Sequence, residues 1–296
     1  MQFTTKKRTL FLVIASIYAS ICLWKLLAHH MFYIVLQSMF LCWLAALLVM
    51  VLVFAVSYKK HRYDYVDAGW GVSFIAVALT VFWMGVVPHQ RFEPVRLLAL
   101  GLVVLWGLRL SWHILRRILA SSQEDPRHVE LRAAWHQVTP IKIFGRMFLV
   151  QSILVTFVSV PVIHILLSKK AEWMSWTTAG LIVWVLGFAC EFVADAQLKT
   201  FTSSSQNRGK LLRTGLRTYS RHPNYFGEIV LWWGMAIIAL GIPHGWVGAG
   251  GAALISFLIV YVSGIPPAER RSASKLGWEE YKRTTPALVP FVWRWL

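Results

Sequence analysis

The densest group of side chains able to do chemistry lies between residues 213 and 228, in the segment RTGLRTYSRHPNYFGE. A proline at position 223 suits the first turn of a helix, because its φ is already fixed and its missing N–H would have no partner there. A helix beginning at that proline points free backbone N–H groups at the nearby basic side chains, an arrangement that binds phosphate. We therefore predict an anion site made of residues around this helix start: Arg213, Arg217, Tyr219, Arg221, His222 and Tyr225.

The same predicted helix carries an amide and a carboxylate one turn apart. Asn224 and Glu228 are separated by four residues and therefore lie on one helical face. An amide and a carboxylate in this register can hold a ribose or a carboxamide. A loop that only anchors a helix among lipid headgroups would not need both groups, so the pair favours a binding site.

Two apolar stretches contain ionisable side chains, which are costly inside a membrane and are functional candidates by default. One stretch holds Glu191 and Asp195 a turn apart, followed by Lys199. The other places four basic residues on one helical face: Arg109, His113, Arg116 and Arg117. We expect the two carboxylates to face Arg109 inside the bundle. A cofactor site and a purely structural ion pair both remain open.

A further pair of acidic residues stands at the start of another apolar stretch. Asp64 and Asp67 are placed there either to cap a helix or to act in catalysis. Asp67 and Glu191 are the candidate catalytic residues. The histidines show no spacing typical of a membrane metal site, and no Ser or Cys stands beside a base at a recognisable spacing. We therefore expect no metal centre.

The elements that must position these residues are membrane-spanning helices. Hydrophobic residues make up 57% of the chain and charged residues only 15%, which is too apolar for one soluble domain. Runs long enough to cross a hydrocarbon layer recur along the chain, and a backbone in lipid satisfies its hydrogen bonds as helix. We predict an all-α polytopic bundle with about eight spans: 9–28, 33–57, 69–87, 97–118, 144–167, 175–198, 225–242 and 246–265.

The net charge of +17 follows the predicted topology and does not indicate nucleic-acid binding. If the N-terminus is cytoplasmic, 24 of the 30 Lys and Arg residues fall on the cytoplasmic side, which is the positive-inside bias. We therefore expect cytoplasmic termini, a site facing the cytoplasm, and contact with anionic lipid. Residues 1–58 are predicted to form a two-helix anchor and residues 59–296 a six-helix catalytic domain.

Several motifs together resemble a known group of membrane enzymes. The run GLRTYSRHPNYFGE ending at residue 228, EFVADAQLK at 191–199 and YKRTTPALVPF at 281–291 are similar to the steroid 5-alpha-reductase-like superfamily. The bacterial DUF1295 branch is the most similar, because DAGWG at 67–71, LRLSWH at 108–113 and EDPR at 124–127 also match its pattern. The resemblance covers roughly residues 60–296.

The resemblance implies a bacterial inner-membrane enzyme with an NADPH pocket facing the cytoplasm. It also implies reduction of an activated carbon–carbon double bond in a lipid-soluble, sterol-like or isoprenoid substrate. Carried over by position, Asp195, Asn224 and Glu228 match cofactor-contacting residues of the family, and Arg109 matches an arginine on the preceding conserved helix, which we include among the candidate cofactor residues. Four positions depart from the steroid reductases, which have Asn, Tyr, His and Tyr where this chain has Glu191, Trp106, Arg270 and Ser274.

Two other functions are compatible with parts of this pattern. Isoprenylcysteine and phospholipid methyltransferases, which use S-adenosylmethionine, share a similar RHPxYxG turn. Their tails usually carry a Glu-Glu pair, whereas Glu269 here is followed by Arg270 and Arg271, which favours a cofactor bearing phosphates. A transporter or scaffold is the third possibility, but the polar groups cluster at one end and form no path through the bilayer. The residues do not indicate an oligomeric state.

Overall fold

The computed structural model describes residues 32–88, 90, 92–168 and 170–290, and this part of the chain contains helices and no strand. The predicted all-α fold is therefore confirmed. The α-helices are α2 (Phe32–Lys60), α3 (Tyr65–Val81), α4 (Pro94–Leu119), α5 (Pro126–Ala133), α6 (Pro140–Ile143), α7 (Val150–Val158), α8 (Val160–Leu167), α9 (Ser175–Ser203), α10 (Pro223–Leu240), α11 (Gly248–Phe257), α12 (Ile265–Ser272) and α13 (Trp278–Thr284). Wider π-helical turns are η1 (Phe82–Val86), η2 (Phe144–Leu149) and η6 (Leu258–Val262), and 3₁₀ turns are η3 (Ser205–Asn207), η4 (Gly215–Thr218) and η5 (Gly245–Val247).

Six helices of the described part are long and apolar enough to cross a membrane: Leu36–Lys60, Tyr65–Val86, Pro94–Leu119, Pro140–Val158, Ser175–Ser203 and Gly245–Ser272. They correspond to six of the predicted spans. The predicted span 9–28 lies outside the described residues. The predicted span 225–242 corresponds to α10, which is not among the six and carries Asn224 and Glu228 in its first turns. The count of eight spans stays a prediction.

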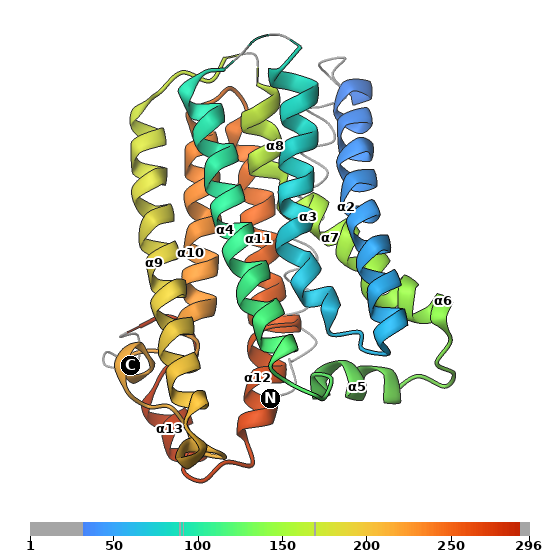
Figure 1. Ribbon diagram of the computed structural model, residues 1–296. Coiled ribbons are helices and arrows are strands. Elements are labelled where there is room, and N and C mark those ends of the chain that lie inside the picture. The colour runs from blue at the N-terminus through green and yellow to red at the C-terminus, as the bar shows by residue number, and fades with distance from the viewer. Residues whose placement is uncertain (1–31, 89, 91, 169, 291–296) are drawn as a thin grey trace, which may run out of the picture.

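The predicted span 144–167 is not one continuous helix. It is divided between α7 and α8 at Ser159, two residues before Pro161. A proline inside a helix removes one backbone donor and its ring crowds the preceding turn, which breaks or kinks the helix. This correction matters because the division lets α7 and α8 take different directions (Figure 1).

The long helices run side by side, and the short helices α5, α12 and α13 lie together at one end of the bundle (Figure 1). At this end α4 and α9 finish and α10 begins. The segments 119–143 and 199–224 and the chain after residue 266 therefore meet at one end, as the sequence predicts. The cytoplasmic location of this end and of the termini stays a prediction. So does the division at residue 58, although α2 packs against α3 and α7.

Glycines bring the backbones of α9 and α10 into direct contact. A Cβ atom added to Gly227 would lie 2.5 Å from the backbone nitrogen of Glu191, and one added to Gly234 would lie 2.6 Å from that of Trp184. Small residues at a helix interface allow this approach in membrane proteins. The contact fixes the acidic face of α9 beside the first turns of α10.

An aromatic cluster connects α3, α4 and α10 in the buried core. The centre of the Phe74 ring lies 5.3 Å from that of Trp106 and 4.9 Å from that of Trp232. The ring centres of the two tryptophans are 5.3 Å apart. Each of these rings is at most 1% exposed. Such aromatic pairs contribute roughly 0.5–1.5 kcal/mol beyond the area they bury. The cluster is thus a rigid support for the polar residues beside it, and Trp70 packs edge-on against Phe74.

Candidate functional site

A cavity of about 700 Å³ lies at the end of the bundle where the predicted site residues gather. Its volume is in the range typical of small-molecule sites. The predicted site residues that line it are Asp67, His113, Arg117, Glu191, Asp195, Arg217, Arg221, His222, Asn224, Tyr225 and Glu228. The predicted residues that do not line it are Arg109, Lys199, Arg213, Tyr219 and Arg270.

Arg109 of α4 pairs with both carboxylates of α9, as the sequence predicts. Its guanidinium contacts Glu191 and lies 2.8 Å from Asp195 Oδ2. Trp106 donates a hydrogen bond of 3.0 Å from Nε1 to the other carboxylate oxygen of Glu191. His113 lies 3.8 Å from Asp195, so one arginine and one histidine face two carboxylates.

Two departures from the steroid-reductase pattern contact each other in this structure. Trp106 stands where those enzymes are expected to have Tyr, and Glu191 where they are expected to have Asn. The 3.0 Å hydrogen bond between these two side chains shows that they form one unit with Arg109.

The first turn of α10 presents two polar groups that have no partner in the described part of the chain. The helix begins at Pro223, as predicted. Asn224 Oδ1 is buried without a hydrogen bond, and Glu228 makes neither an ion pair nor a hydrogen bond with a described residue. A buried amide oxygen without a donor is unusual in a folded protein and indicates a missing ligand or water.

Two of the predicted phosphate-binding arginines instead hold the C-terminal segment. Arg213 contacts Glu280 at 3.0 Å and the carbonyl of Gly277, and its side chain does not line the cavity. Arg221 forms an ion pair with Glu269 and donates a hydrogen bond of 3.0 Å to the backbone carbonyl of Lys282. These contacts fasten α13 and the chain after it to the turn that precedes α10.

Three cations on the cavity wall have no acidic partner among the described residues: Lys210, Arg217 and Lys275. Arg217 donates only to the backbone carbonyl of Arg221, at 2.6 Å, and its Nε is buried and unpaired. Burial lowers the pKa of Lys275, and the positive charges of Arg217 and Arg271 lower it further. This part of the cavity therefore carries uncompensated positive charge suited to an anion.

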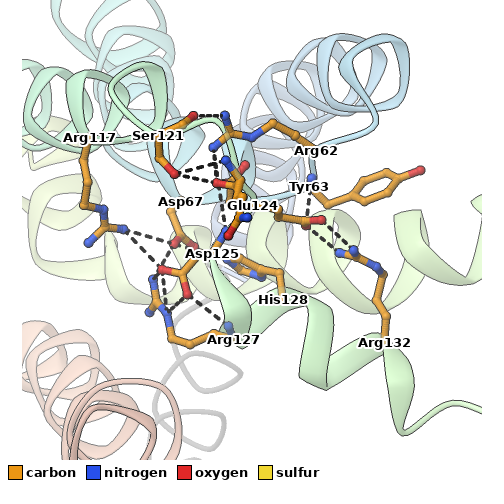
Figure 2. Close-up of polar contacts among 12 residues, drawn as sticks. Arg62, Tyr63, Asp67, Arg117, Ser121, Glu124, Asp125, Arg127, His128 and Arg132 are labelled. Carbon is orange, nitrogen blue, oxygen red and sulfur yellow. Dashed lines mark hydrogen bonds and ion pairs between the residues drawn. The ribbon is translucent and has the colours of Figure 1, made fainter. Parts of the chain in front are cut away.

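A second ionic network lies where α3 meets α5 (Figure 2). Asp67 Oδ2 is 2.9 Å from Arg127 and 3.2 Å from His128. Arg127 also pairs with Asp125 at 2.9 Å, and Arg117 reaches toward both carboxylates (Figure 2). Asp67 therefore lines the cavity as a carboxylate surrounded by cations, and its catalytic role stays a prediction.

The expected capping role of Asp64 is not observed. Asp64 occupies the residue before α3 but makes no side-chain cap bond. Its carboxylate instead accepts a hydrogen bond of 2.8 Å from the side chain of Arg62 and one of 3.1 Å from the backbone N–H of Asp125. Its carboxylate thus ties the start of α3 to the loop that leads into α5.

The network holds its titratable groups in their charged forms. Burial alone would raise the pKa of Asp125, but hydrogen bonds and charge from Arg127 outweigh burial and keep the pKa well below its usual value. Burial alone would lower the pKa of His128, but the carboxylate of Asp67 outweighs burial and raises the pKa. Ionisation of these two groups therefore couples the position of α5 to pH.

We expect His128 to make the stability of the protein depend on pH near neutrality. Because folding raises its pKa, the protonated ring stabilises the fold below its ordinary pKa of about 6.5, and this is lost as the pH rises through the raised value. Between roughly pH 6 and pH 9 the wild type should therefore lose more stability than His128→Gln, which has no ring to deprotonate. Asp125, with its lowered pKa, contributes a change only in strong acid.

Thermal midpoints across this pH range measure the effect. Intrinsic fluorescence is suitable because the chain has 16 tryptophans. His136→Gln is the matched control, since His136 is an exposed loop residue. Identical pH profiles for the wild type and His128→Gln would contradict the predicted role of the ring.

The structure adds residues that the sequence analysis did not select. Arg127, Lys210, Lys275 and Gln151 line the cavity, and His128 pairs with Asp67. The only sequence signal for these residues was the EDPR motif at 124–127. In it Asp125 caps α5 by accepting a hydrogen bond of 3.0 Å from the backbone N–H of Arg127. The other residues come from segments whose approach depends on how the helices pack.

Comparison with known proteins agrees with the resemblance seen in the sequence. The model of the family described as "Protein of unknown function (DUF1295)" matches residues 53–285, most of the chain. The chain belongs to the DUF1295 family. This match includes α3, α4, α9, α10 and α12, from which the cavity is built.

This DUF1295 protein is also similar to steroid reductases over part of its length. Steroid 5-alpha-reductase DET2 of Gossypium hirsutum is 29% identical over 120 residues, which is 39% of this chain and 42% of that protein. The same enzyme of Arabidopsis thaliana is 28% identical over 132 residues, which is 42% of this chain and 45% of that protein. Human 3-oxo-5-alpha-steroid 4-dehydrogenase 1 is 27% identical over 113 residues, which is 38% of this chain and 40% of that protein. The matched part spans less than half of each relative.

Proposed function

We propose that this protein is a membrane-embedded reductase that uses NADPH to reduce an activated carbon–carbon double bond in a lipid-soluble, sterol-like or isoprenoid substrate. The names of its relatives support a reductase acting on a steroid-type lipid. The observation that carries the proposal is one cavity containing an unpartnered amide, cations without acidic partners, and an apolar wall. NADPH has a carboxamide and phosphates that match the first two features.

The residues present fit this cofactor. The buried Oδ1 of Asn224 has no donor, and a carboxamide N–H would supply one. Lys210, Arg217 and Lys275 would neutralise phosphate groups through charge-assisted hydrogen bonds. S-adenosylmethionine carries no phosphate and a single carboxylate, so it would leave at least two of these three cations uncompensated. This difference favours NADPH over the methyl donor.

When bound, NADPH supplies a hydride, and the residues of the chain position the reactants and control the surroundings. Asn224 and Glu228 would orient the nicotinamide or its ribose from the first turn of α10. The unit of Arg109, Glu191 and Asp195 holds α4 against α9, so the wall behind these groups stays fixed. Positioning of this kind is a major source of rate enhancement.

We place the cavity on the cytoplasmic side of a bacterial inner membrane, because most of the basic residues lie at the same end of the bundle. NADPH made in the cytoplasm would reach the cavity from that side. The lipid would reach it from the bilayer, since the cavity is also lined by apolar residues of α7 and η6.

The test is a thermal shift of the purified protein with NADPH and, separately, with S-adenosylmethionine. A ligand present at 100 times its Kd stabilises a protein by about 2.7 kcal/mol, which is readily measured. We expect NADPH to raise the thermal midpoint and S-adenosylmethionine to leave it unchanged. The reverse result would overturn the proposal and support a methyltransferase.

A variant locates the binding site within the same experiment. Asn224→Ala should abolish the NADPH shift while the unliganded midpoint changes little, because the amide oxygen it removes has no partner to lose. Asn207→Ala is the control, since Asn207 does not line the cavity and its side chain donates to the backbone carbonyl of Phe201. An undiminished shift in Asn224→Ala would show that the cofactor binds elsewhere.

A further inference from the structure

One wall of the cavity is apolar except for a single side chain. This wall is formed by α7 and by α11 with η6, and its apolar members are Val150, Leu154, Ile255, Leu258, Ile259 and Val262. The exception is Gln151, which lies between Val150 and Leu154 on the cavity side of α7. A lone amide on an apolar wall is the pattern by which a pocket orients a largely hydrophobic ligand.

The amide of Gln151 has no partner in the described part of the chain. Its Oε1 is buried without a hydrogen bond, and its Nε2 donates to no described residue. Leaving an amide unpaired in apolar surroundings is unfavourable, so a buried polar group of this kind calls for a ligand or an ordered water. A glutamine can donate through Nε2 and accept through Oε1, and both suit an oxygen of a ligand.

The backbone on both sides of this wall is also unusual. The π-helical turns of η2 end at Leu149, two residues before Gln151 of α7. Those of η6 supply Leu258, Ile259 and Val262 to the part of the same wall that α7 does not form. Such turns are rare and are found frequently at functional sites, because the wider turn aims side chains away from the regular helical register. Two of them at one cavity wall are an observation independent of the unpaired amide.

Two other polar groups of the cavity are less suited to a neutral carbonyl. Asp67 accepts from Arg127 and lies beside His128, so its carboxylate offers acceptors and no donor. The hydroxyl of Tyr281 already donates a hydrogen bond of 2.6 Å to the backbone carbonyl of Arg217. Gln151 is therefore the uncharged donor available on the apolar wall.

We propose that Gln151 binds the carbonyl oxygen of a cyclic, sterol-like enone whose rings lie against the wall formed by α7 and η6. This inference rests on the proposed function and specifies the substrate end that the chain recognises. Hydride addition to the β-carbon of an enone would move the electron pair of the double bond toward the carbonyl oxygen until a proton from water reaches the α-carbon, and a fixed donor at that oxygen stabilises the charge. Gln151 is thus a specificity-determining residue that also polarises the reacting group.

The test compares two lipids that differ only in the carbonyl. Cholest-4-en-3-one and cholest-4-ene are titrated into the purified protein without cofactor, and affinity is read from the thermal midpoint. A buried hydrogen bond that one ligand makes and the other cannot is worth about a tenfold preference or more. We expect the wild type to prefer the ketone by about this factor and Gln151→Met to bind both lipids about equally.

The variants separate recognition from structure. Methionine has nearly the length of glutamine and fills the same space without hydrogen bonding. Gln137→Met, in the exposed loop between α5 and α6, should keep the preference for the ketone. In all variants the NADPH shift should persist, which shows that the fold is intact.

Two results would overturn the inference. One is a preference for the ketone that survives in Gln151→Met, and the other is a wild type that fails to bind the ketone more tightly than the hydrocarbon. The proposed function fails in a different way, by the absence of an NADPH shift in the wild type. A Gln151-dependent preference without that shift would keep the lipid site and reject the reductase.

Discussion

Replacing Arg109 by methionine should destabilise the protein by about 3–5 kcal/mol, because it leaves buried carboxylates without their cation. In the structure this guanidinium faces Glu191 and Asp195, which are 2% and 8% exposed. Breaking a buried pair on one side is far more costly than removing both partners. The measurement is the thermal or chemical unfolding of the purified variant in detergent.

The carboxylates themselves provide the decisive comparison for Arg109→Met. Adding Glu191→Gln and Asp195→Asn removes the uncompensated charge, so the triple variant should regain a large part of the loss. Arg116→Met is the matched control on the same helix, since Arg116 is exposed and is placed only over the ring of Trp112. Equal midpoints for Arg109→Met and Arg116→Met would show that the buried pairs contribute little.

The fold was largely predictable because each span carries its own signal. A run of apolar residues long enough to cross the bilayer indicates a helix without knowledge of its neighbours. The break at Pro161 was missed because the length of an apolar run does not depend on a proline within it, although that proline interrupts the helix. The start of α10 was located because the proline at its first position is a local rule.

The site was predictable only where charge or register acts within one segment. Arg109, Glu191 and Asp195 were paired in advance because an ion inside a span requires a counter-charge. The ion pairs of Arg213 and Arg221 were not predicted, since their partners lie more than forty residues away in α13 and α12. No local pattern reveals such partners, because the charge of an arginine suits a phosphate and a carboxylate equally.

The unpaired amides of Asn224 and Gln151 illustrate the same limit. Whether a polar group is satisfied depends on every neighbour that packing brings to it, so an orphaned atom can be recognised only in three dimensions. Asn224 was selected from the sequence because it shares a face with Glu228. Gln151 shares its turn of α7 with Val150, Ser152 and Ile153, none of which is ionisable, and was not selected.

Replacing Gly227 by valine should damage both the fold and the cofactor site, because α9 and α10 touch through their backbones there. An added Cβ would lie 2.5 Å from the Glu191 nitrogen, and backbone atoms cannot move aside as a flexible side chain can. Overpacking of this kind costs about 1–3 kcal/mol and sometimes more. Separation of the helices would also move Asn224 and Glu228 away from the acidic face of α9, so the NADPH shift should disappear.

Gly101→Val isolates the contribution of the helix contact from that of helix propensity. Gly101 is an exposed residue within α4, and nothing lies within 4 Å of a Cβ added to it. Both variants place the same β-branched residue inside a helix, so their intrinsic effects on the helical backbone are similar. Thermal midpoints and NADPH shifts of the two proteins should therefore differ by the cost of parting α9 from α10. Two variants with the same midpoint and the same shift would contradict the view that this backbone contact builds the site.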